Sequence, residues 1–361
     1  MIFRNNHWNT KAIVFLNGGF LKEKFEQLKP SIKVNYLKNG SWLGSMKSKK
    51  WLYNLSQIYY LPKSYNFIKN VGTIIDREKI NIIHTNTITI IEGGKLAKKK
   101  NISHFIQVRE LIDLDYYQYL ISKEKVIAKL EKNSDVIIAN SERTKKGLLK
   151  LGMKKDKIKV IYNTVSPSTI QLDIRDLIQL DKEIQIVAIV GWIRPVKRIE
   201  DFIKISKQFH DMNEIKFVII GGYGGNTNYN NFIKELIADS PNVIYINTVD
   251  NIPCYMKSFN LLISTCDIES FGRTVAEALI EGTPAIGIQS CGVAEIIQHE
   301  KSGFLVEKSD VNSMVKYTKL LLDDENLNKK MGLFGKQDVE KKFGVETIRK
   351  KYLELYNEFK K

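Results

Sequence analysis

The sequence predicts an α/β protein made of two doubly wound domains. Three observations support this: short β-branched runs alternate with amphipathic segments, these runs are apolar throughout, and the rhythm breaks once near the middle of the chain. Continuous apolar strands separated by helices are typical of parallel sheets covered on both faces. A chain of 361 residues with 43% hydrophobic content is too long for one ordinary core, so two domains are expected.

The first half contains five strand-like runs, and residues 122–133 between two of them have the spacing of an amphipathic helix. Turn residues bound each run. The runs are AIVFL at 12–16, INIIHT at 80–85, HFIQV at 104–108, VIIAN at 136–140 and KVIYN at 159–163. This half therefore predicts a parallel sheet with helices between its strands.

A polar, turn-rich segment at 163–183 interrupts the pattern and contains a proline. The alternation then resumes with five apolar runs: IQIVAIVG at 184–191, IKFVIIGG at 215–222, VIYIN at 243–247, LLISTC at 261–266 and PAIGI at 284–288. We therefore expect an N-terminal domain at 1–165, a C-terminal domain at 183–344 and a final helix within 345–361.

The composition disfavours several kinds of protein. Cys254, Cys266 and Cys291 lie far apart with no histidine at ligand spacing, which disfavours a metal site and a disulfide framework and fits a reducing cytosol. No apolar run approaches the roughly 18 residues that span a bilayer, and the N-terminus lacks the apolar core of a signal peptide. The sequence therefore predicts a soluble, cytoplasmic protein.

The net charge of +16 is concentrated in the first half. Residues 1–176 contain 32 basic and 15 acidic side chains, a net charge of +17, and the remainder carries −1. This asymmetry favours an anionic partner, either a lipid surface or a nucleic acid, although a lysine-rich genome would also explain it. We favour a membrane surface because lysines at 47–50 lie near Trp42 and Trp51, and a second lysine run lies at 98–100. No RNA-binding aromatic motif supports a nucleic-acid partner.

Two loops of the second half have the composition of ligand-binding loops, since ligands of doubly wound sheets bind where strands lead into helices. GWIRPVKRIEDF starts at Gly191 and carries Arg194, Lys197 and Arg198. Cations beside a helix N-terminus suit a diphosphate, although a solvated helix start is the plain alternative. GGYGGNTNYN, which includes Gly222, allows close approach of backbone to a ligand, as an ordinary flexible turn also would.

A third loop, STCDIESFGRTVAEALIEGTPAIG, holds two glutamates eight residues apart. We expect Ser270 to be the N-cap of a helix that runs from Phe271 to Gly282. Glu277 then lies about 10 Å along the helix axis from the loop that contains Glu269, at about 1.5 Å per residue. This separation resembles the span from the sugar of a nucleotide diphosphate sugar to its ribose.

The two glutamates are predicted to bracket an anion without touching it. Glu269 accepts hydrogen bonds from the sugar and Glu277 from the ribose, whereas the N–H groups near Phe271 and Gly272 meet the phosphates. Each glutamate alone would more often be an ordinary surface residue. Only the combined pattern favours a binding site.

The stretch Glu269-Ser-Phe-Gly-Arg-Thr-Val-Ala-Glu277 resembles the E-x7-E motif of family 4 retaining glycosyltransferases. Other elements resemble the same family, and together they cover most of the chain: Gly282-Thr-Pro284, Cys291-Gly-Val-Ala-Glu295, Gly303-Phe-Leu-Val306, the loop 191–198, and the segments 135–141 and 160–163. The resemblance implies a GT-B architecture, in which two Rossmann-like domains face a cleft, the second holds the donor, and the last helix packs back on the first.

The resemblance also implies the chemistry. A sugar passes with retention from a nucleotide diphosphate sugar, with UDP or GDP expected, and the leaving phosphate takes the acceptor proton in the front-face mechanism attributed to the family. No metal and no cofactor are implied, since side chains and helix N–H groups can neutralise the diphosphate. The expected catalytic residues are Glu269, Lys197 and Arg194, and the expected donor-binding residues are Gly191, Gly222, Ser270, Phe271, Gly272 and Glu277.

The chain departs from the family pattern at several positions. Trp192 stands where the family has an arginine, and Gln107 stands where many relatives have a sugar-facing histidine. On the acceptor side we expect Gly18, Gly19, Gln107 and Arg109. The first βα unit of the family is hard to find, so the chain is expected to begin one unit late, with the acceptor side completed by a partner if need be.

The expected acceptor is a lipid-linked saccharide or polysaccharide at the cytoplasmic membrane face, because the +17 half favours an anionic membrane surface. The enzyme would then be peripheral on that membrane. The alternative is a non-catalytic glycosyltransferase-like subunit that activates or stabilises a partner transferase, which would explain Trp192 and Gln107 together. Turnover of the isolated chain with nucleotide sugars discriminates between the two.

Overall fold

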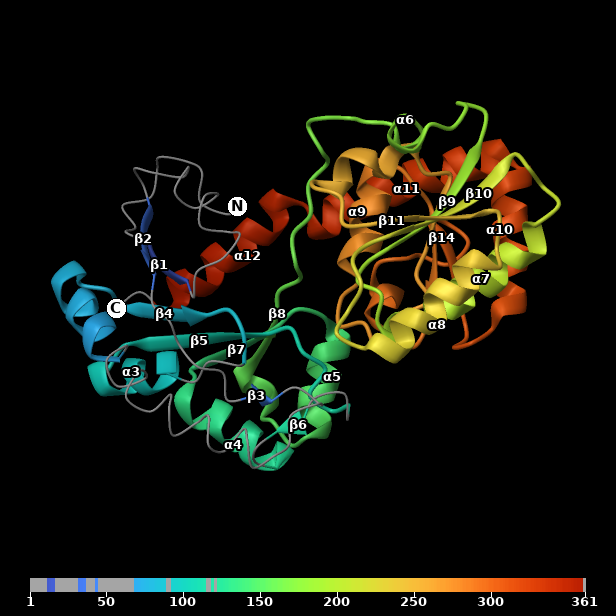
Figure 1. The fold of residues 1–361 in the computed structure, drawn as a ribbon. Coiled ribbons are helices and arrows are strands. Elements are labelled where there is room, and N and C mark those ends of the chain that lie inside the picture. Colours follow the sequence, from blue (N-terminus) through green and yellow to red (C-terminus); the bar gives the residue numbers. More distant parts are fainter. Residues whose placement is uncertain are drawn as a thin grey trace. The chain divides into compact units, whose positions relative to one another are not determined.

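The protein folds into two compact α/β units (Figure 1). The structure is a computed structural model, which describes residues 12–16, 32–36, 43–44, 68–88, 92–114, 118–119 and 122–359. One unit comprises Met1–Ile161 together with Lys351–Lys361, and the other comprises Tyr162–Lys350. Each is described below by itself.

The first unit is built on a parallel sheet with the strand order β4-β5-β7-β8. Its strands are β4 (Ile82–Thr85), β5 (Ser103–Val108), β7 (Val136–Ala139) and β8 (Ile158–Val160). A helix at 68–78 precedes β4, and the helical segments after it are α3 (Glu92–Lys100), α4 (Lys123–Asn133), α5 (Glu142–Lys150) and η1 (Lys155–Lys157). Two short pairs complete the described part, β1 (Ala12–Leu16) with β2 (Ile32–Tyr36) in parallel and β3 (Leu43–Gly44) with β6 (Gln118–Tyr119) antiparallel.

Local sequence explains where these helices begin. The Ser122 and Ser141 side chains accept hydrogen bonds from the N–H groups of Lys125 and Thr144, which caps α4 and α5. The aliphatic residues at 106 and 108 of β5 and at 137 and 139 of β7 are buried with residues of these helices in one apolar core. The helix predicted at 122–133 and the predicted strands of this half are therefore confirmed, except that the strand predicted at 159–163 ends at residue 160.

The second unit contains a six-stranded parallel sheet with the order β11-β10-β9-β12-β13-β14. Its strands are β9 (Gln185–Val190), β10 (Ile215–Ile220), β11 (Val243–Ile246), β12 (Leu261–Ile263), β13 (Ala285–Ile288) and β14 (Gly303–Val306). The first five coincide with the five predicted apolar runs. The chain builds outward from β9 to β11 and then crosses to the opposite side of β9, which is the doubly wound topology.

Helices cover both faces of this sheet (Figure 1). On one face lie α7 (Ile199–Ser206) and α8 (Thr227–Ala238), and on the other α9 (Arg273–Glu281) and α11 (Glu325–Phe343). The remaining elements of the unit are α6 (Ile174–Ile178), α10 (Val311–Asp323), η2 (Pro195–Lys197), η3 (Lys207–Phe209), η4 (Ile252–Ser258) and η5 (Gly292–Glu295). Because both faces are covered, the central strands are almost wholly buried, as their apolar sequences predict, whereas most residues of the edge strand β11 are half-buried.

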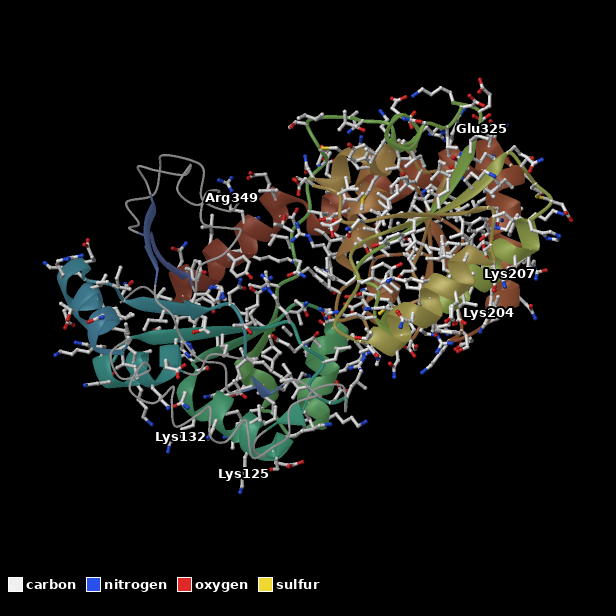
Figure 2. All side chains as sticks on the ribbon, in the orientation of Figure 1. Lys125, Lys132, Lys204, Lys207, Glu325 and Arg349 are labelled. Atoms are coloured by element: carbon white, nitrogen blue, oxygen red, sulfur yellow. The ribbon has the colours of Figure 1, made fainter. Side chains whose placement is uncertain are left out.

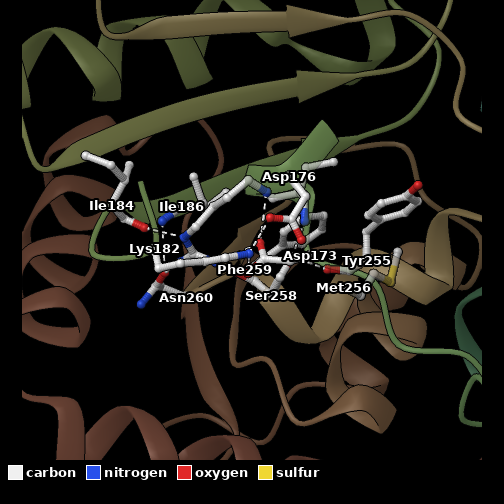
Figure 3. A network of polar contacts seen from close by, with 12 residues as sticks. Asp173, Asp176, Lys182, Ile184, Ile186, Tyr255, Met256, Ser258, Phe259 and Asn260 are labelled. Carbon is white, nitrogen blue, oxygen red and sulfur yellow. Dashed lines mark hydrogen bonds and ion pairs between the residues drawn. The ribbon is translucent and has the colours of Figure 1, made fainter. Parts of the chain in front are cut away.

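The polar segment between the two predicted domains packs on the second unit. Arg175 is buried in α6 and donates to the carbonyl groups of Ile184 and Ser258 and to the side-chain oxygen of Asn260. Lys182 bridges Asp173 and an aspartate of α6 in the same network (Figure 3). These bonds fix the segment, which the predicted domain ranges left unassigned.

The last helix, α12 (Val345–Glu358), begins in the second unit and ends in the first. Its later turns pack on the sheet of the first unit, where the Tyr356 ring stacks on Phe105 with centroids 5.6 Å apart. The Tyr356 hydroxyl lies 2.6 Å from Nδ1 of His84. Among the described residues, no helix has the length and apolar character needed to cross a bilayer.

Candidate functional site

The candidate site lies at the switch point of the second sheet, between β9 and β12. The chain leaves β9 toward one side of the sheet and leaves β12 toward the other, so the loops at the carboxyl ends of these strands diverge and open a crevice. A small pocket occupies this place. It is lined by Ile189, Val190, Lys197, Ile263, Ser264, Thr265, Cys266 and Thr274.

The loops after β9 and β12 bring Lys197 and Glu269 together. Nζ of Lys197 lies 2.7 Å from Oε2 of Glu269, and both side chains keep part of their surface exposed. The Thr265 hydroxyl donates to the Lys197 carbonyl at 2.6 Å, which ties the two loops to each other. Lys197 and Glu269, which the sequence predicts to bind the same ligand, are therefore neighbours.

Lys197 is charged in this environment. Burial lowers the pKa of Lys197, but the attraction of Glu269 and their hydrogen bond raise it, and the net pKa lies above the ordinary value. An ammonium group has three donors, so Lys197 can hold Glu269 and still donate to an incoming anion. Lys197 thus places a positive charge at the crevice, beside the carboxylate of Glu269.

Two of the three cysteines border this site and are protonated. Burial raises the pKa of the Cys266 thiol to about 11 and that of Cys291 to about 12. The Cys291 thiol donates to the carbonyls of Cys266 and Ile288. All three cysteines lie in the described part of the chain and are buried and free, so these two act as packing groups.

The glycine loops after β9 and β10 lie against each other. The Ile193 N–H donates to the Gly222 carbonyl and the Gly224 N–H donates to the Ile193 carbonyl. A Cβ at Gly221 would lie 2.1 Å from the carbonyl oxygen of Gly191, and Gly221 has a φ of +149°. Glycine is therefore required at 221 by both space and backbone conformation.

The helix after the Glu269 loop begins later than the sequence indicated. Ser270 was the predicted N-cap, with the helix from Phe271, but α9 starts at Arg273 and its N-cap is Gly272. Gly272 has a φ of +97°, which suits glycine, and the Phe271 ring is buried against Tyr162 and another aromatic of the core. Packing of this ring delays the start of the helix.

The first turn of α9 begins at a glycine. Gly272 has no side chain that could accept a hydrogen bond from the helix, and the first N–H groups of any helix have no backbone partner within it. The loop before the turn is held from behind, because Gly292 donates to the Glu269 carbonyl and lies close against the Ser270 backbone. A helix start of this kind attracts a phosphate.

Glu277 lies in α9 and pairs with Arg273, not with Lys197. Its Oε1 accepts from Nε of Arg273 at 2.6 Å, one turn earlier, and its side chain is largely buried. The predicted spacing of about 10 Å counted residues 271 and 272 as helical, which they are not. The two glutamates nevertheless flank the first turn of α9, one before it and one within the helix.

Arg194 lies beside Trp192. The Arg194 guanidinium carbon is 5.8 Å from the centre of the Trp192 ring, and both side chains are exposed. The structure therefore brings together Lys197 and Glu269, whereas Arg194 is held at the aromatic side chain that replaces the arginine of the family pattern.

The residues predicted on the acceptor side belong to the first unit. Gln107 is buried, accepts from Nη2 of Arg109 at 3.3 Å and is hydrogen-bonded to the Tyr352 hydroxyl of α12. Gly18 and Gly19 lie outside the described residues. The side-chain amide of Gln107 is thus hydrogen-bonded within the first unit.

Sequence reasoning missed the residues that position the site. Thr265 and Thr274 line the pocket, and Arg273 pairs with Glu277. A hydroxyl near the carboxyl end of the predicted run at 261–266 could have drawn attention to Thr265. The four-residue spacing on a helix could have predicted the Arg273–Glu277 pair. No comparable feature of the sequence indicates Thr274 as a pocket residue.

Family models of glycosyltransferases match both halves of the chain. Residues 171–338 match the family of Glycosyl transferases group 1, and residues 50–169 match Glycosyltransferase Family 4. The chain belongs to the family 4 glycosyltransferases. The resemblance that the motifs indicated is confirmed, and the chain is a sugar-transferring enzyme by family.

Two relatives of this family 4 glycosyltransferase cover most of its length. It is 26% identical over 310 residues to the N-acetyl-α-D-glucosaminyl L-malate synthase of Bacillus anthracis, which spans 83% of this chain and 81% of that protein. It is 26% identical over 330 residues to the capsular polysaccharide biosynthesis glycosyltransferase CapM of Staphylococcus aureus, spanning 85% and 80%.

Solved structures show the same fold. HepE of Anabaena, crystallised with UDP and glucose, superposes with a TM-score of 0.80 at 18% identity over 96% of this chain and 92% of that one. A sucrose-phosphate synthase superposes with a TM-score of 0.73 at 18% identity over 96% and 95%. The predicted GT-B fold of the family 4 glycosyltransferase is thereby confirmed.

Proposed function

We propose that the protein transfers a sugar, with retention, from a nucleoside diphosphate sugar to a lipid-linked saccharide or polysaccharide at the cytoplasmic membrane face. The observation that carries the donor part is the Lys197–Glu269 pair at the switch point, next to the start of α9. The names of relatives support the substrate class, since one acts in capsular polysaccharide synthesis and HepE was crystallised with UDP.

Each group has a role in this proposal. Lys197 and the N–H groups at the start of α9 stabilise the departing diphosphate as its charge develops. Glu269 orients the sugar hydroxyls while it holds Lys197, and Glu277 accepts from the ribose hydroxyls. The leaving phosphate takes the acceptor proton, so the reaction needs no separate base.

The proposal is tested by turnover of the isolated chain with UDP-, GDP- and ADP-sugars, with hydrolysis counted as activity. The stereochemistry is read by NMR of the anomeric proton in the product. A thermal-shift screen selects the donor first, because a ligand at 100 times its Kd stabilises a protein by about 2.7 kcal/mol. Binding without turnover would favour the non-catalytic subunit, and an inverted product would refute retention.

Chelation should leave transfer unaffected. Lys197 and the α9 N–H groups are proposed to neutralise the diphosphate without a metal or other cofactor, so EDTA should change the rate by less than about twofold. The product should be quantified directly by chromatography, which avoids coupling enzymes that need magnesium. Loss of activity on chelation, with recovery on adding magnesium or manganese, would contradict the metal-free mechanism.

Glu277→Ala should weaken binding of the bare nucleoside diphosphate by about 1–3 kcal/mol, because a carboxylate acceptor for the ribose hydroxyls is lost. Its partner Arg273 is mostly exposed, so the fold should tolerate the change. Glu269→Ala provides the contrast: it should keep the affinity for the bare diphosphate and reduce discrimination among nucleotide sugars. Calorimetric titrations measure both, and equal losses of diphosphate affinity would show that the roles are wrongly divided.

The acceptor part of the proposal depends on the basic first half. The described part of the first unit carries exposed lysines on α4, among them Lys125, Lys129 and Lys132. Lys125 and Lys132 project outward from this helix (Figure 2). Basic residues near an anionic bilayer contribute about 1 kcal/mol each, so a few of them hold a protein at the surface. The lysines at 47–50 lie outside the described residues.

Replacing Lys125, Lys129 and Lys132 with glutamate should reduce sedimentation with vesicles that contain phosphatidylserine and leave donor hydrolysis intact. Wild-type binding should fall steeply as salt rises past about 0.15 M, where the Debye length is about 8 Å. The matched control changes Lys204 and Lys207 of the second unit, which carries no excess of positive charge. If wild-type protein ignores acidic vesicles at low salt, a soluble acceptor becomes the better proposal.

A further inference from the structure

Trp192 is an exposed aromatic side chain beside the proposed donor site. It follows Gly191 directly after β9, and 54% of its surface is accessible. The other exposed large apolar side chains of the described residues lie elsewhere, in the segment before α6 or on α6, α8, α10 and α11. Exposure of an indole costs free energy that contact with a ligand would recover.

The indole is held in place by its neighbours. The next residue, Ile193, donates to the Gly222 carbonyl at 2.9 Å, which fixes the backbone beside the ring. A Cβ at Gly222 would lie 3.0 Å from the ring carbon Cζ3, so the ring rests against this glycine. With Arg194 at its side, the ring is positioned before any ligand arrives.

Trp192 lies in the loop after β9 that also carries Lys197, the residue that pairs with Glu269. A Cβ at the adjacent Gly191 would lie 3.7 Å from Cε of Lys197, whose ammonium holds Glu269. Glu277 is paired elsewhere, with Arg273 of α9. The Thr248 hydroxyl is also near the ring, 3.0 Å from the same Cβ position at Gly222. An aromatic face with a hydroxyl beside it suits a ligand that has both C–H and O–H groups.

We propose that Trp192 packs against the C–H face of a pyranose ring bound at the sugar end of the donor site. The inference rests on the proposed function and extends it to a contact that sets sugar specificity. A pyranose presents axial C–H groups on one face and hydroxyls at its rim, so an indole can cover the face while Glu269 and Thr248 reach the rim. The ring can belong to the transferred sugar or to the acceptor, and the chemistry of the contact is the same.

A single-tryptophan variant shows whether Trp192 contacts the transferred sugar or the acceptor sugar. The chain has four tryptophans, so changing Trp8, Trp42 and Trp51 to phenylalanine leaves Trp192 as the only indole. Its emission is followed while UDP, UDP-glucose, UDP-N-acetylglucosamine, or UDP with methyl glucoside is added. A response to a nucleotide sugar but not to UDP assigns the donor sugar, and a response only to the glucoside assigns the acceptor. Emission unchanged by every ligand, with binding confirmed by calorimetry, overturns the proposal.

Affinity measurements on the otherwise wild-type chain provide a second test. Trp192→Ala should raise either the Kd for the nucleotide sugar or the KM for the acceptor about tenfold, with an unchanged Kd for UDP, whereas Trp192→Phe should keep most of the affinity. Phe232→Ala, at an exposed aromatic of α8, is the matched control and should change neither constant.

The outcomes separate this inference from the proposed function. A wild-type chain that binds nucleotide sugars without turning them over refutes the proposed function, and the fluorescence titration still decides the role of Trp192. Trp192→Ala with both constants unchanged overturns the inference while leaving the transferase function intact. A wild-type chain that binds no nucleotide sugar and no glucoside overturns both.

Discussion

Replacing Lys197 with alanine should lower kcat for sugar transfer by about 10²- to 10³-fold, with little change in Tm. Its ammonium is the cation that the structure places at the switch point beside the pocket. Removing it leaves the Glu269 carboxylate without its partner at the place where the diphosphate gains negative charge, and such charge stabilisation acts mainly in the transition state. Release of the nucleoside diphosphate under saturating donor measures kcat.

Two companion variants identify the cause of that loss. Lys204→Ala removes an exposed lysine that also pairs with a carboxylate, Asp201, and should leave kcat unchanged. Combining Lys197→Ala with Glu269→Gln removes both charges, so any recovery relative to Lys197→Ala measures repulsion by the unpaired glutamate. If Lys197→Ala alone keeps the wild-type kcat, the phosphate role passes to Arg194 or Arg198.

The strands could be predicted from sequence because they are buried on both faces. Val218, for example, lies in an unbroken apolar run that no amphipathic helix could accommodate, and the structure buries it completely in β10. The ends of strands could also be predicted, because glycine, serine or polar residues follow them. Those ends located Lys197 and Glu269, since both follow strands whose loops meet at the switch point.

The start of α9 could not be predicted from local sequence. Ser270 matches the N-cap preference, yet the helix starts after Gly272 because the Phe271 side chain enters the core and Gly292 packs on the loop. Those contacts join residues that are far apart in sequence, and local preference is too weak to oppose them. The environment of Gln107 was hidden for the same reason, since its partner Tyr352 lies in the last helix.

Trp192 shows a different limit. As a sequence position it is only a departure from a family pattern, and that departure weakened the case for catalysis. Its exposure, and its position against Gly222, depend on how two glycine loops lie beside each other. A sequence can indicate that an expected cation is absent, but only the surroundings of the replacement indicate what it can bind.

Gly221→Ala should destabilise the second unit by about 2–5 kcal/mol and lower its Tm by roughly 5–15 °C. The added Cβ would lie 2.1 Å from the carbonyl oxygen of Gly191, and a φ of +149° is costly for any residue with a Cβ. The obstacle is backbone, which cannot rotate away as a side chain can. Thermal unfolding followed by circular dichroism measures the shift.

Gly225→Ala is the matched control for that prediction, because it lies in the same loop and a Cβ there would meet no atom within 4 Å. It should change the Tm by no more than a few degrees. Because Gly221 sets how close the loop after β10 comes to the loop that carries Trp192 and Lys197, the folded fraction of Gly221→Ala should also bind donor more weakly than Gly225→Ala. Equal stability and equal donor affinity for the two variants would mean that the loops after β9 and β10 do not pack as closely as their hydrogen bonds indicate.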